Sequence, residues 1–455
     1  MNRAERNAAG HPFPSTPQTV VVGGGFTGLA AAYELAKRGL RPTLLEADSE
    51  LGGLAGTFPV GDTRVERFYH HWFTNDQHLA ELVAELGMND SLLVRPGRTG
   101  MYFANSLFRL ASPLDLLRFK PLSLVGRIRL GMLLPAARSV RRWQDLDDRS
   151  AASWLRETCG EEVYRVVWEP LLRGKFGEHA ETVSAAWFWA KLRLRGASRG
   201  RTGREQLVYF KGGFAALADE IVRRIAQAGG RVMTGNAAKQ LLASQGRITG
   251  VVSDAGIIPA EALVLATPLP QAAGLLSDIA PSCYVDGLRK IRHLSNRCLV
   301  LELDRSLSEI YWLNINDPSF PFVGIIEHTN FADPAAYGGR HIVYLSRYCS
   351  AGDRFLSMSN QEALAFALPY LKRMFPTFNE GMILAAHSWQ SDYAQPLVEV
   401  GYTKLIPDHR TPISGAYLAT MAQVYPEDRG TNYAIRDGRK VAGLLADEIA
   451  ASRAG

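Results

Sequence analysis

A short valine run followed by glycines constrains the fold of this chain more than any other stretch. Residues 20–22 are all valine, and Gly23, Gly25 and Gly28 follow in the pattern G-x-G-x-x-G, ahead of an alanine-rich segment. In a strand–turn–helix unit, the first glycine permits the tight turn and the second lets the backbone approach a pyrophosphate. The third lets the helix pack closely on the strand. The pattern predicts a dinucleotide site at the start of the helix.

The next segment supports this prediction. The helix is expected to end near Arg38, with Gly39 as its C-terminal cap, and a second strand over residues 42–45 ends in Glu46, 18 residues after Gly28. A carboxylate at that strand end accepts hydrogen bonds from a ribose diol and disfavours a 2′-phosphate. The alternative is that Glu46 is a solvated strand terminus.

A second pair of glycines, Gly52 and Gly53, follows Leu51. A simple NAD-binding unit does not need such a pair at this position. With the first motif, it resembles the superfamily of FAD-dependent amine oxidases, protoporphyrinogen oxidases and phytoene-type desaturases. The resemblance implies FAD as cofactor, and it implies that FAD contacts the following residues: Gly23, Gly25, Phe26, Thr27, Gly28, Glu46, Ala47, Gly52, Gly53, Leu54, Phe68, Tyr69, Ala238, Thr267, Asp428, Thr431, Asn432 and Tyr433.

Two later segments carry the rest of this resemblance. The pair Gly212-Gly213 precedes a predicted helix over residues 215–228, and residues 262–268 are expected to end a core strand at Thr267. Near the C-terminus, a strand over residues 415–420 is followed by a helix that begins within residues 427–438. In the superfamily, the start of this helix faces the flavin ring, where its N–H groups stabilise negative charge. Asp428 would then contact the ribityl or pyrophosphate part of FAD.

The segment 64–76 is dense in aromatic and imidazole groups, including His70 and His71. It is similar to a stretch of UDP-galactopyranose mutases, which share the fold. Both histidines are therefore candidates for proton transfer or flavin contact. The alternative is that they are buried structural residues.

The residues expected to meet the substrate lie in the second half of the chain. Strands are predicted near residues 298–303, 323–326 and 341–345, in a mixed or antiparallel sheet that floors a substrate cavity. Arg297 occupies the position where many amine oxidases carry a lysine near the flavin, so it is a catalytic candidate. His328, Tyr393 and Gln395 lie in polar clusters at strand ends and are candidate substrate contacts, although loop polarity explains them equally well.

Charge is unevenly distributed along the chain. The formal net charge is +6, but residues 109–142 carry eight basic residues against one acidic residue, Asp115, and residues 191–204 carry six basic residues and no acidic one. Helices broken at Pro121 and Pro135 are expected over residues 112–142, and Ser150 is expected to cap the next helix. The basic segments are either solvated faces or contacts for an anionic substrate or a membrane surface. No nucleic-acid-binding motif accompanies them.

These observations together predict an α/β protein with a Rossmann-like FAD-binding domain of the glutathione reductase/amine oxidase type and an inserted α+β substrate domain. The FAD-binding domain is expected over residues 18–75, 205–275 and 410–455, the substrate domain over 76–204 and 276–409, and a disordered lead-in over 1–17. The four cysteines lack metal-site spacing, so no metal is expected. No run of 18 apolar residues occurs, and the chain is expected to be cytoplasmic, with peripheral membrane contact as an option.

The expected function is removal of hydride from a C–N or C–C bond of a small molecule of unknown identity, anionic or amphiphilic in character. Two alternatives remain open at this point. One is a redox-neutral flavin-dependent mutase acting on a nucleotide sugar. The other is a carrier of prenyl chains or lipids that shares this fold, as the Rab escort proteins do, and performs no chemistry.

Overall fold

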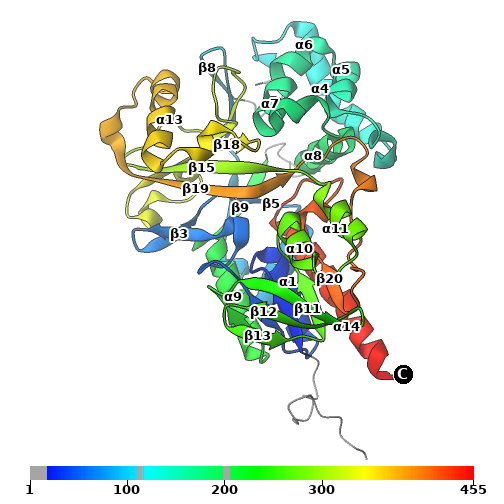
Figure 1. The fold of residues 1–455 in the computed structure, drawn as a ribbon. Coiled ribbons are helices and arrows are strands. Elements are labelled where there is room, and N and C mark those ends of the chain that lie inside the picture. The colour runs from blue at the N-terminus through cyan, green and yellow to red at the C-terminus, as the bar shows by residue number, and fades with distance from the viewer. Residues whose placement is uncertain (1–17, 110–114, 116, 198–204, 455) are drawn as a thin grey trace, which may run out of the picture.

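The computed structural model describes residues 18–109, 115, 117–197 and 205–454, so the lead-in expected over residues 1–17 lies outside them. A five-stranded parallel sheet forms the base of the molecule (Figure 1). Its strand order is β10 (Arg231–Met233), β2 (Thr43–Leu45), β1 (Thr19–Val22), β14 (Ala262–Leu265) and β20 (Ala416–Leu418). Strands from both ends of the chain therefore meet in one sheet.

The two faces of this sheet are covered differently. Val21, Leu44 and Val264 share a buried cluster with residues of α1 (Phe26–Lys37), α9 (Gly213–Gln227) and α14 (Thr431–Ala454). Their neighbours Val22 and Leu263 share another cluster with the antiparallel sheet of β11 (Ala238–Ser244), β12 (Arg247–Ser253) and β13 (Gly256–Pro259) and with α10 (Leu269–Leu276). Because alternate residues of a strand point to opposite faces, a strand buried on both sides is apolar throughout, as the valine run predicts.

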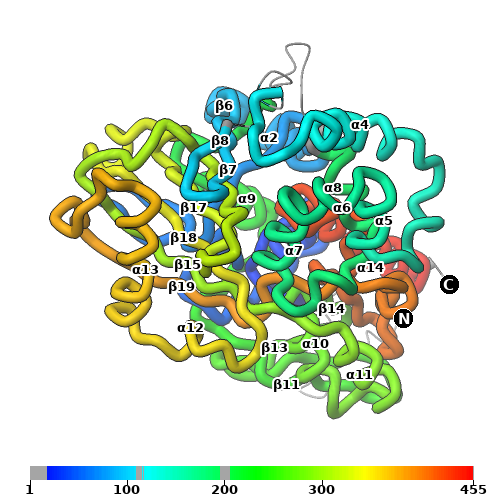
Figure 2. Tube along the Cα trace, turned by 90° about the horizontal axis from the view of Figure 1, so that it is seen from above, coloured from blue at the N-terminus to red at the C-terminus, as the bar shows by residue number. Residues whose placement is uncertain are grey.

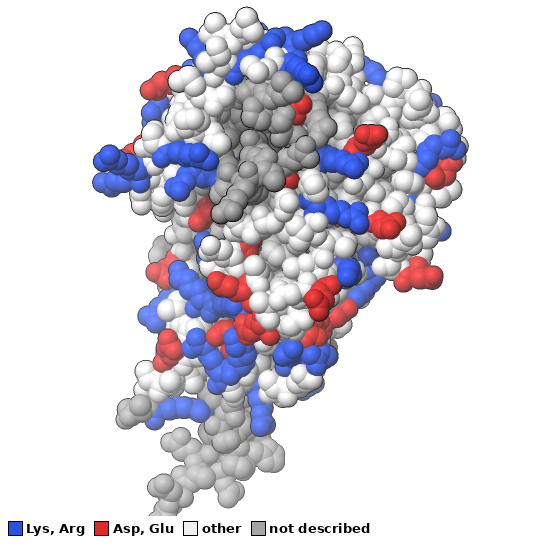
Figure 3. All heavy atoms as spheres, turned by 180° about the vertical axis from the view of Figure 1, so that it is seen from behind, with Lys and Arg blue, Asp and Glu red and all other residues white. Residues whose placement is uncertain are grey.

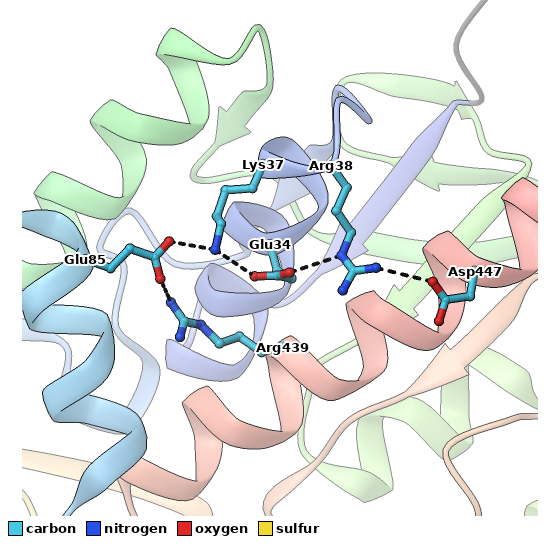
Figure 4. Close-up of polar contacts among 6 residues, drawn as sticks. All are labelled: Glu34, Lys37, Arg38, Glu85, Arg439 and Asp447. Atoms are coloured by element: carbon cyan, nitrogen blue, oxygen red, sulfur yellow. Dashed lines mark hydrogen bonds and ion pairs between the residues drawn. The ribbon is translucent and has the colours of Figure 1, made fainter.

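Close approach of α1 and α14 depends on Gly438. A Cβ atom at Gly438 would lie 2.2 Å from the Thr27 carbonyl oxygen of α1. Charged side chains at the C-terminal end of α1 and along α14 link these two helices to each other and to α2 (Gln77–Leu86), as Figure 4 shows. Glu85 of α2 binds both Lys37 and Arg439, and Arg38 binds Glu34 and Asp447. Such surface pairs contribute little individually, so the glycine contact is the stronger constraint on the helix crossing.

A seven-stranded sheet lies above the base. Its order is β19 (Ile383–Pro396), β15 (His293–Leu303), β18 (His341–Cys349), β17 (Gly324–Glu327), β16 (Trp312–Ile315), β7 (Thr99–Phe103) and β8 (Ser106–Arg109). All neighbours are antiparallel except β16 and β7, so the sheet is mixed, as predicted. Helices α12 (Arg354–Ser357) and α13 (Asn360–Met374) lie on the same side of the molecule as this sheet (Figure 2).

The region beside this upper sheet is helical and lies to the right in Figure 2. They are α4 (Leu124–Ser139), α5 (Ala151–Cys159), α6 (Glu161–Val163), α7 (Glu169–Phe176) and α8 (Ala185–Ala197), with a π-helical turn over Tyr164–Trp168. Apart from short 3-10 helices, the remaining elements of the described residues are α11 (Ser282–Arg289) and two small antiparallel sheets. One pairs β3 (Thr57–Val60) with β4 (Thr63–Glu66), and the other has the order β5 (Trp72–Phe73), β9 (Gln206–Phe210) and β6 (Leu92–Pro96).

Two expectations for the helical region have different outcomes. The Ser150 hydroxyl accepts a hydrogen bond from the Ser153 backbone N–H, so the predicted cap is confirmed. The predicted break at Pro135 is wrong, because α4 continues through it. A proline inside a helix removes one backbone hydrogen bond, and here the packing of Leu133 and Ala137 against the core outweighs that loss. No helix in the described part of the chain is both long and apolar enough to cross a bilayer.

Candidate functional site

A cavity of about 760 Å³ opens at the carboxyl ends of the parallel strands and reaches β19 of the upper sheet. Ligands of open α/β sheets bind at this edge. Its walls include the loops after β1, β2 and β14 and the start of α14. On β19 the lining residues are Trp389, Gln390, Ser391 and Tyr393. One continuous space therefore joins the glycine motif to the seven-stranded sheet.

The glycines of the first motif are required by backbone proximity. Gly23 has a φ of +108°, and a Cβ atom there would lie 2.7 Å from the Ala266 carbonyl oxygen. A Cβ atom at Gly28 would lie 1.8 Å from the Gly23 carbonyl oxygen. Gly25 pairs with Gly52, and the Gly52 N–H donates to the Gly24 carbonyl at 2.9 Å. The first glycine motif and the Gly52-Gly53 pair thus form one wall of the cavity that carries no side chains. We call it the glycine wall, and there the backbone can approach a phosphate.

Glu46 lies at the end of β2 and lines the cavity beside this wall. Its carboxylate accepts hydrogen bonds from the Gly24 N–H at 2.6 Å and from the Asp48 N–H at 2.8 Å. Each carboxylate oxygen can accept more than one hydrogen bond, so acceptor capacity remains for a ribose. Its position fits the predicted ribose contact.

The start of α14 borders the same cavity through Gly430, Thr431 and Ala434. The Gly430 carbonyl accepts the first helical hydrogen bonds, from the N–H groups of Tyr433 and Ala434. Earlier N–H groups of a helix have no partner within it and carry partial positive charge. This end of the cavity is therefore suited to a negatively charged group.

The cavity residues fit FAD. The glycine wall has the shape that a pyrophosphate needs, Glu46 matches a ribose, and the Thr267 hydroxyl is buried in the cavity wall without a hydrogen-bond partner among the described residues. Of the residues expected to contact FAD, the following line the cavity: Gly23, Gly25, Phe26, Thr27, Glu46, Ala47, Gly52, Gly53, Leu54, Phe68, Ala238, Thr267 and Thr431. Their individual contacts with FAD stay predictions.

The other expected FAD contacts lie behind this lining. Gly28 supports the turn, and Tyr69 packs edge-on against Trp312 with ring centres 4.9 Å apart. The Asn432 side chain accepts a hydrogen bond from the Leu79 N–H at 3.0 Å. Asp428 is held by two lysines and is discussed below. Tyr433 is also outside the residues that line the cavity.

His70 and His71 have different surroundings. His70 lines the cavity, and its Nδ1 lies 2.6 Å from the Phe68 carbonyl oxygen. Since a carbonyl only accepts, Nδ1 carries the proton and Nε2 keeps its lone pair. Burial lowers the pKa of His70 to about 4, so the ring is neutral near pH 7. His71 instead contacts the Tyr311 hydroxyl at 3.0 Å and is not among the cavity-lining residues.

Three further expected residues, Arg297, His328 and Gln395, also lie outside the cavity lining. The Arg297 guanidinium donates to the carbonyls of Phe355 and Met358, each at 2.6 Å. His328 is buried against the Tyr337 hydroxyl at 2.7 Å, and Gln395 is buried and bonds to the Pro396 carbonyl at 3.1 Å. These side chains form hydrogen bonds with backbone carbonyls or with the buried Tyr337 hydroxyl. Their positions in the sequence do not reveal these contacts. Of the expected substrate contacts, Tyr393 lines the cavity.

Other cavity residues were not anticipated from the sequence. Arg67 stacks over Trp389 at 4.8 Å from the ring centre and pairs with Asp48 at 2.5 Å. Both Arg67 and Trp389 line the cavity, as does Arg429. Arg429 lies within the segment where the C-terminal helix is predicted to begin, and this position is a signal that the sequence offers. Trp389 lies on a strand that no motif connects to the glycines.

Fold and cavity define a dinucleotide-binding protein of the Rossmann-like type. Residues 26–446 match the flavin-containing amine oxidoreductases, and the chain belongs to that family, whose cofactor is a flavin. A flavin-containing monoamine oxidase of Mycobacterium tuberculosis, AofH, is 28% identical over 270 residues, which is 56% of this chain and 58% of that protein. The alignment thus spans less than two thirds of this relative.

Solved structures share the fold. Cyclohexylamine oxidase from Brevibacterium oxydans superimposes with a TM-score of 0.72 at 17% identity, covering 95% of this chain and 99% of that one. Reduced UDP-galactopyranose mutase superimposes with a TM-score of 0.70 at 13% identity, covering 94% of this chain and 95% of that one. At these identities the likeness concerns the fold. The predicted fold class and the suspected superfamily are confirmed.

Proposed function

We propose that this protein is an FAD-dependent oxidoreductase that removes hydride from a C–N or C–C bond of an anionic or amphiphilic small molecule. The observation that supports this most is the continuous cavity that joins the glycine wall to β19 past a neutral, half-buried histidine, His70. Bound FAD supplies the hydride-accepting chemistry. The protein's own residues bind, orient and deprotonate the substrate.

His70 is the proposed base. Its Nδ1 proton is directed to the Phe68 carbonyl, so Nε2 can accept a proton. Removing a proton beside the carbon that loses hydride leaves a neutral C=N or C=C bond. Trp389 and Phe68 exclude water from the cavity wall and present flat apolar surfaces to the substrate. General-base assistance of this kind contributes roughly 10²–10⁴-fold to a rate.

The test uses purified holoenzyme under anaerobic conditions. Candidate amines and unsaturated ring or chain compounds are added, and bleaching of the visible flavin absorbance is recorded. We expect bleaching with the true substrate class and steady turnover only when an electron acceptor is supplied. Activity that instead requires prior reduction with dithionite, and consumes no acceptor, would establish the mutase alternative. Purified protein that never binds flavin would favour the carrier alternative.

We also propose peripheral contact with an anionic membrane, through a surface here called the α4 face: Leu117, Leu124, Val125, Ile128 and Met132. These five side chains are 58–71% exposed. Within α4 they recur at helical spacing, while Gly126, Leu133 and Ala137 on the opposite side are buried. An exposed apolar stripe on a helix is a mark of an interaction site.

The charge around the α4 face favours a lipid surface as its partner. Arg118, Lys120, Arg129 and Arg138 are exposed beside it. Figure 3, which views the molecule from behind, shows Lys and Arg side chains along the top and left of its upper half. Basic residues next to an anionic membrane contribute about 1 kcal/mol each, and apolar side chains enter the headgroup region.

Liposome flotation tests this contact. Vesicles of phosphatidylcholine with phosphatidylglycerol are expected to retain the protein, more weakly at high salt, whereas Val125→Glu with Ile128→Glu abolishes retention. Ile257→Glu is the matched control, since Ile257 is exposed on β13, away from the α4 face. Equal retention of all three proteins, or no retention of the wild type, contradicts the proposal. Concentration-dependent dimers that the double variant abolishes would assign the α4 face to a protein partner.

A further inference from the structure

A cluster of cations lies beside the cavity at the point where α14 begins. Lys175 comes from α7, Lys191 from α8, and Arg429 from the segment directly before α14. These elements are distant in sequence, so the fold brings the three charges together. Arg429 lines the cavity, and the other two contact its neighbour, Asp428.

Asp428 is the carboxylate at the centre of this cluster. Lys175 Nζ and Lys191 Nζ lie 3.0 and 2.9 Å from the same oxygen, Oδ2, and the indole N–H of Trp187 donates to Oδ1 at 3.1 Å. Burial alone would raise the pKa of Asp428, but the three cations hold it well below its usual range. Asp428 is therefore a full negative charge whose oxygens are already bound, which leaves it poorly suited to contact a ribityl chain.

Even with Lys191 left aside, Asp428 alone does not balance both Lys175 and Arg429. Among the described residues, Lys175 forms an ion pair only with Asp428, and Arg429 forms none. Arg429 donates one hydrogen bond to the Tyr348 hydroxyl at 3.0 Å, and its Nε is buried without a partner among those residues. Buried cations in excess are costly unless an anion pairs with them.

Aromatic rings complete the walls of the cluster. Lys175 and Lys191 lie 4.8 and 4.9 Å from the centre of the Trp187 ring. Lys175 also lies 5.9 Å from the Tyr348 ring, whose hydroxyl binds Arg429. The Lys175 side chain is 13% exposed and that of Lys191 32%, so both side chains are largely enclosed and partly accessible.

We propose that Lys175, Lys191 and Arg429 bind the anionic group of the substrate, a carboxylate or a phosphate. The proposal rests on the proposed function, because it places this group beside the same cavity that His70 borders. It assigns recognition to the cluster and leaves proton transfer to His70. The competing account is that Arg429 only balances the negative charge of the cofactor.

Anion binding to the holoenzyme tests the proposal without turnover. Inorganic phosphate and benzoate, as the phosphate and carboxylate probes, are titrated by calorimetry, with FAD occupancy measured on each sample. Loss of a charge-assisted hydrogen bond weakens binding by roughly 10-fold or more, and we expect this for Lys175→Met and Arg429→Met. Lys372→Met is the control, since Lys372 pairs with Glu380 on the surface of α13. The probe that binds more tightly identifies the anionic group.

Asp428→Asn separates recognition from a structural ion pair. It keeps an acceptor for Trp187 and raises the positive excess, so it should tighten binding of the anion several-fold. If the ion pairs of Asp428 are purely structural, Asp428→Asn should be less stable than the wild type and should bind the anionic probes no more tightly. Lys191→Met replaces Lys175→Met if the latter does not fold.

Two results would overturn the proposal: neither probe binds the wild type, or the cation variants lose FAD while the probes bind them unchanged. Failure of hydride removal with every substrate would leave anion binding intact. The two proposals can therefore fail separately.

Discussion

The Tyr209 hydroxyl donates a hydrogen bond to the Glu66 carboxyl at 2.7 Å, deep between the two sheets. The other oxygen of Glu66 accepts from the Phe214 N–H, also at 2.7 Å. A Cβ atom at Gly213 would lie 2.7 Å from that oxygen. Glu66 therefore fixes the turn that returns the chain to the nucleotide-binding sheet, and Gly213 is a glycine because the carboxyl occupies the space of a side chain.

The first prediction concerns stability as a function of pH. Burial raises the pKa of Glu66 to about 7, against 4.5 in the unfolded chain. The folded state then binds more protons than the unfolded state between these values, so stability falls as pH rises from about 4.5 to 7. A shift of this size corresponds to about 3 kcal/mol. Glu66→Gln imitates the protonated form and should remove most of this loss.

Urea unfolding of the FAD-loaded protein at pH 5 and pH 8 measures the effect. In Glu66→Gln, the free energy of unfolding should still fall somewhat as the pH rises, because burial also raises the pKa of Asp76, to about 6. The exposed Glu261 provides the control substitution, Glu261→Gln. If both variants show the wild-type loss between the two pH values, Glu66 is ionised in the fold.

Most of the parallel sheet at the base of the molecule could be predicted from the sequence. The start of the sheet, β1, α1 and β2, is predicted by the valine run, the glycine motif and Glu46. A dinucleotide site requires particular backbone conformations, and these restrict which residue types can occur over a short stretch of sequence. The upper sheet was also predicted, but not the direction of its side chains. Arg297 stands at the expected strand, yet its guanidinium binds the carbonyls of Phe355 and Met358. That outcome depends on contacts some 60 residues away, as the Phe355 carbonyl shows.

Long-range contacts also explain what was missed at the site. Trp389 reaches the cavity because β19 pairs with β15, which no local pattern encodes. Asp428 matched its expected position next to a helix start, but Lys175 and Lys191 approach it from 253 and 237 residues away. Motifs thus predicted most residues of the candidate cofactor site, whereas the substrate side depends on tertiary packing.

The second prediction separates the two histidines. His70→Ala should lower kcat by about 10²-fold with FAD still bound, since it removes the base. His71→Ala, which lies next to it and contacts Tyr311, should have a smaller effect on kcat. Because burial lowers the pKa of His70 to about 4, kcat/KM should hold its value down to about pH 5. Rapid-mixing kinetics and a pH profile provide both measurements. Equal kcat values for the two variants would assign His70 to packing.

The third prediction concerns retention of FAD. Glu46→Ala removes an acceptor that fits a ribose and releases the Gly24 N–H that it holds. Loss of one charged hydrogen-bond partner costs about 1.5–3 kcal/mol, so the Kd for FAD should rise by at least 10-fold. Fluorescence titration of the apoprotein measures this Kd, and Glu46→Gln should lie between wild type and Glu46→Ala. An unchanged Kd in the folded Glu46→Ala protein removes the ribose assignment.

The fourth prediction uses two glycines of α14. In Gly438→Ala, the new methyl group would lie 2.2 Å from the Thr27 carbonyl oxygen and 3.1 Å from the Ala30 Cβ atom, so α14 must move away from α1. Overpacking of this kind costs about 1–3 kcal/mol, and more where backbone is the obstacle. Because α14 begins at the cavity, its displacement should also weaken FAD binding.

Gly443→Ala on the same helix is the matched control. The nearest atom to its Cβ position is the flexible end of Arg38, at 3.4 Å. Since alanine favours a helix over glycine, this change should be neutral or add up to about 1 kcal/mol of stability. Thermal unfolding measures the stability of both variants, and FAD titration measures their affinity for the cofactor. Equal stability of Gly438→Ala and Gly443→Ala would mean that the close crossing of α1 and α14 does not constrain the start of α14 at the cavity.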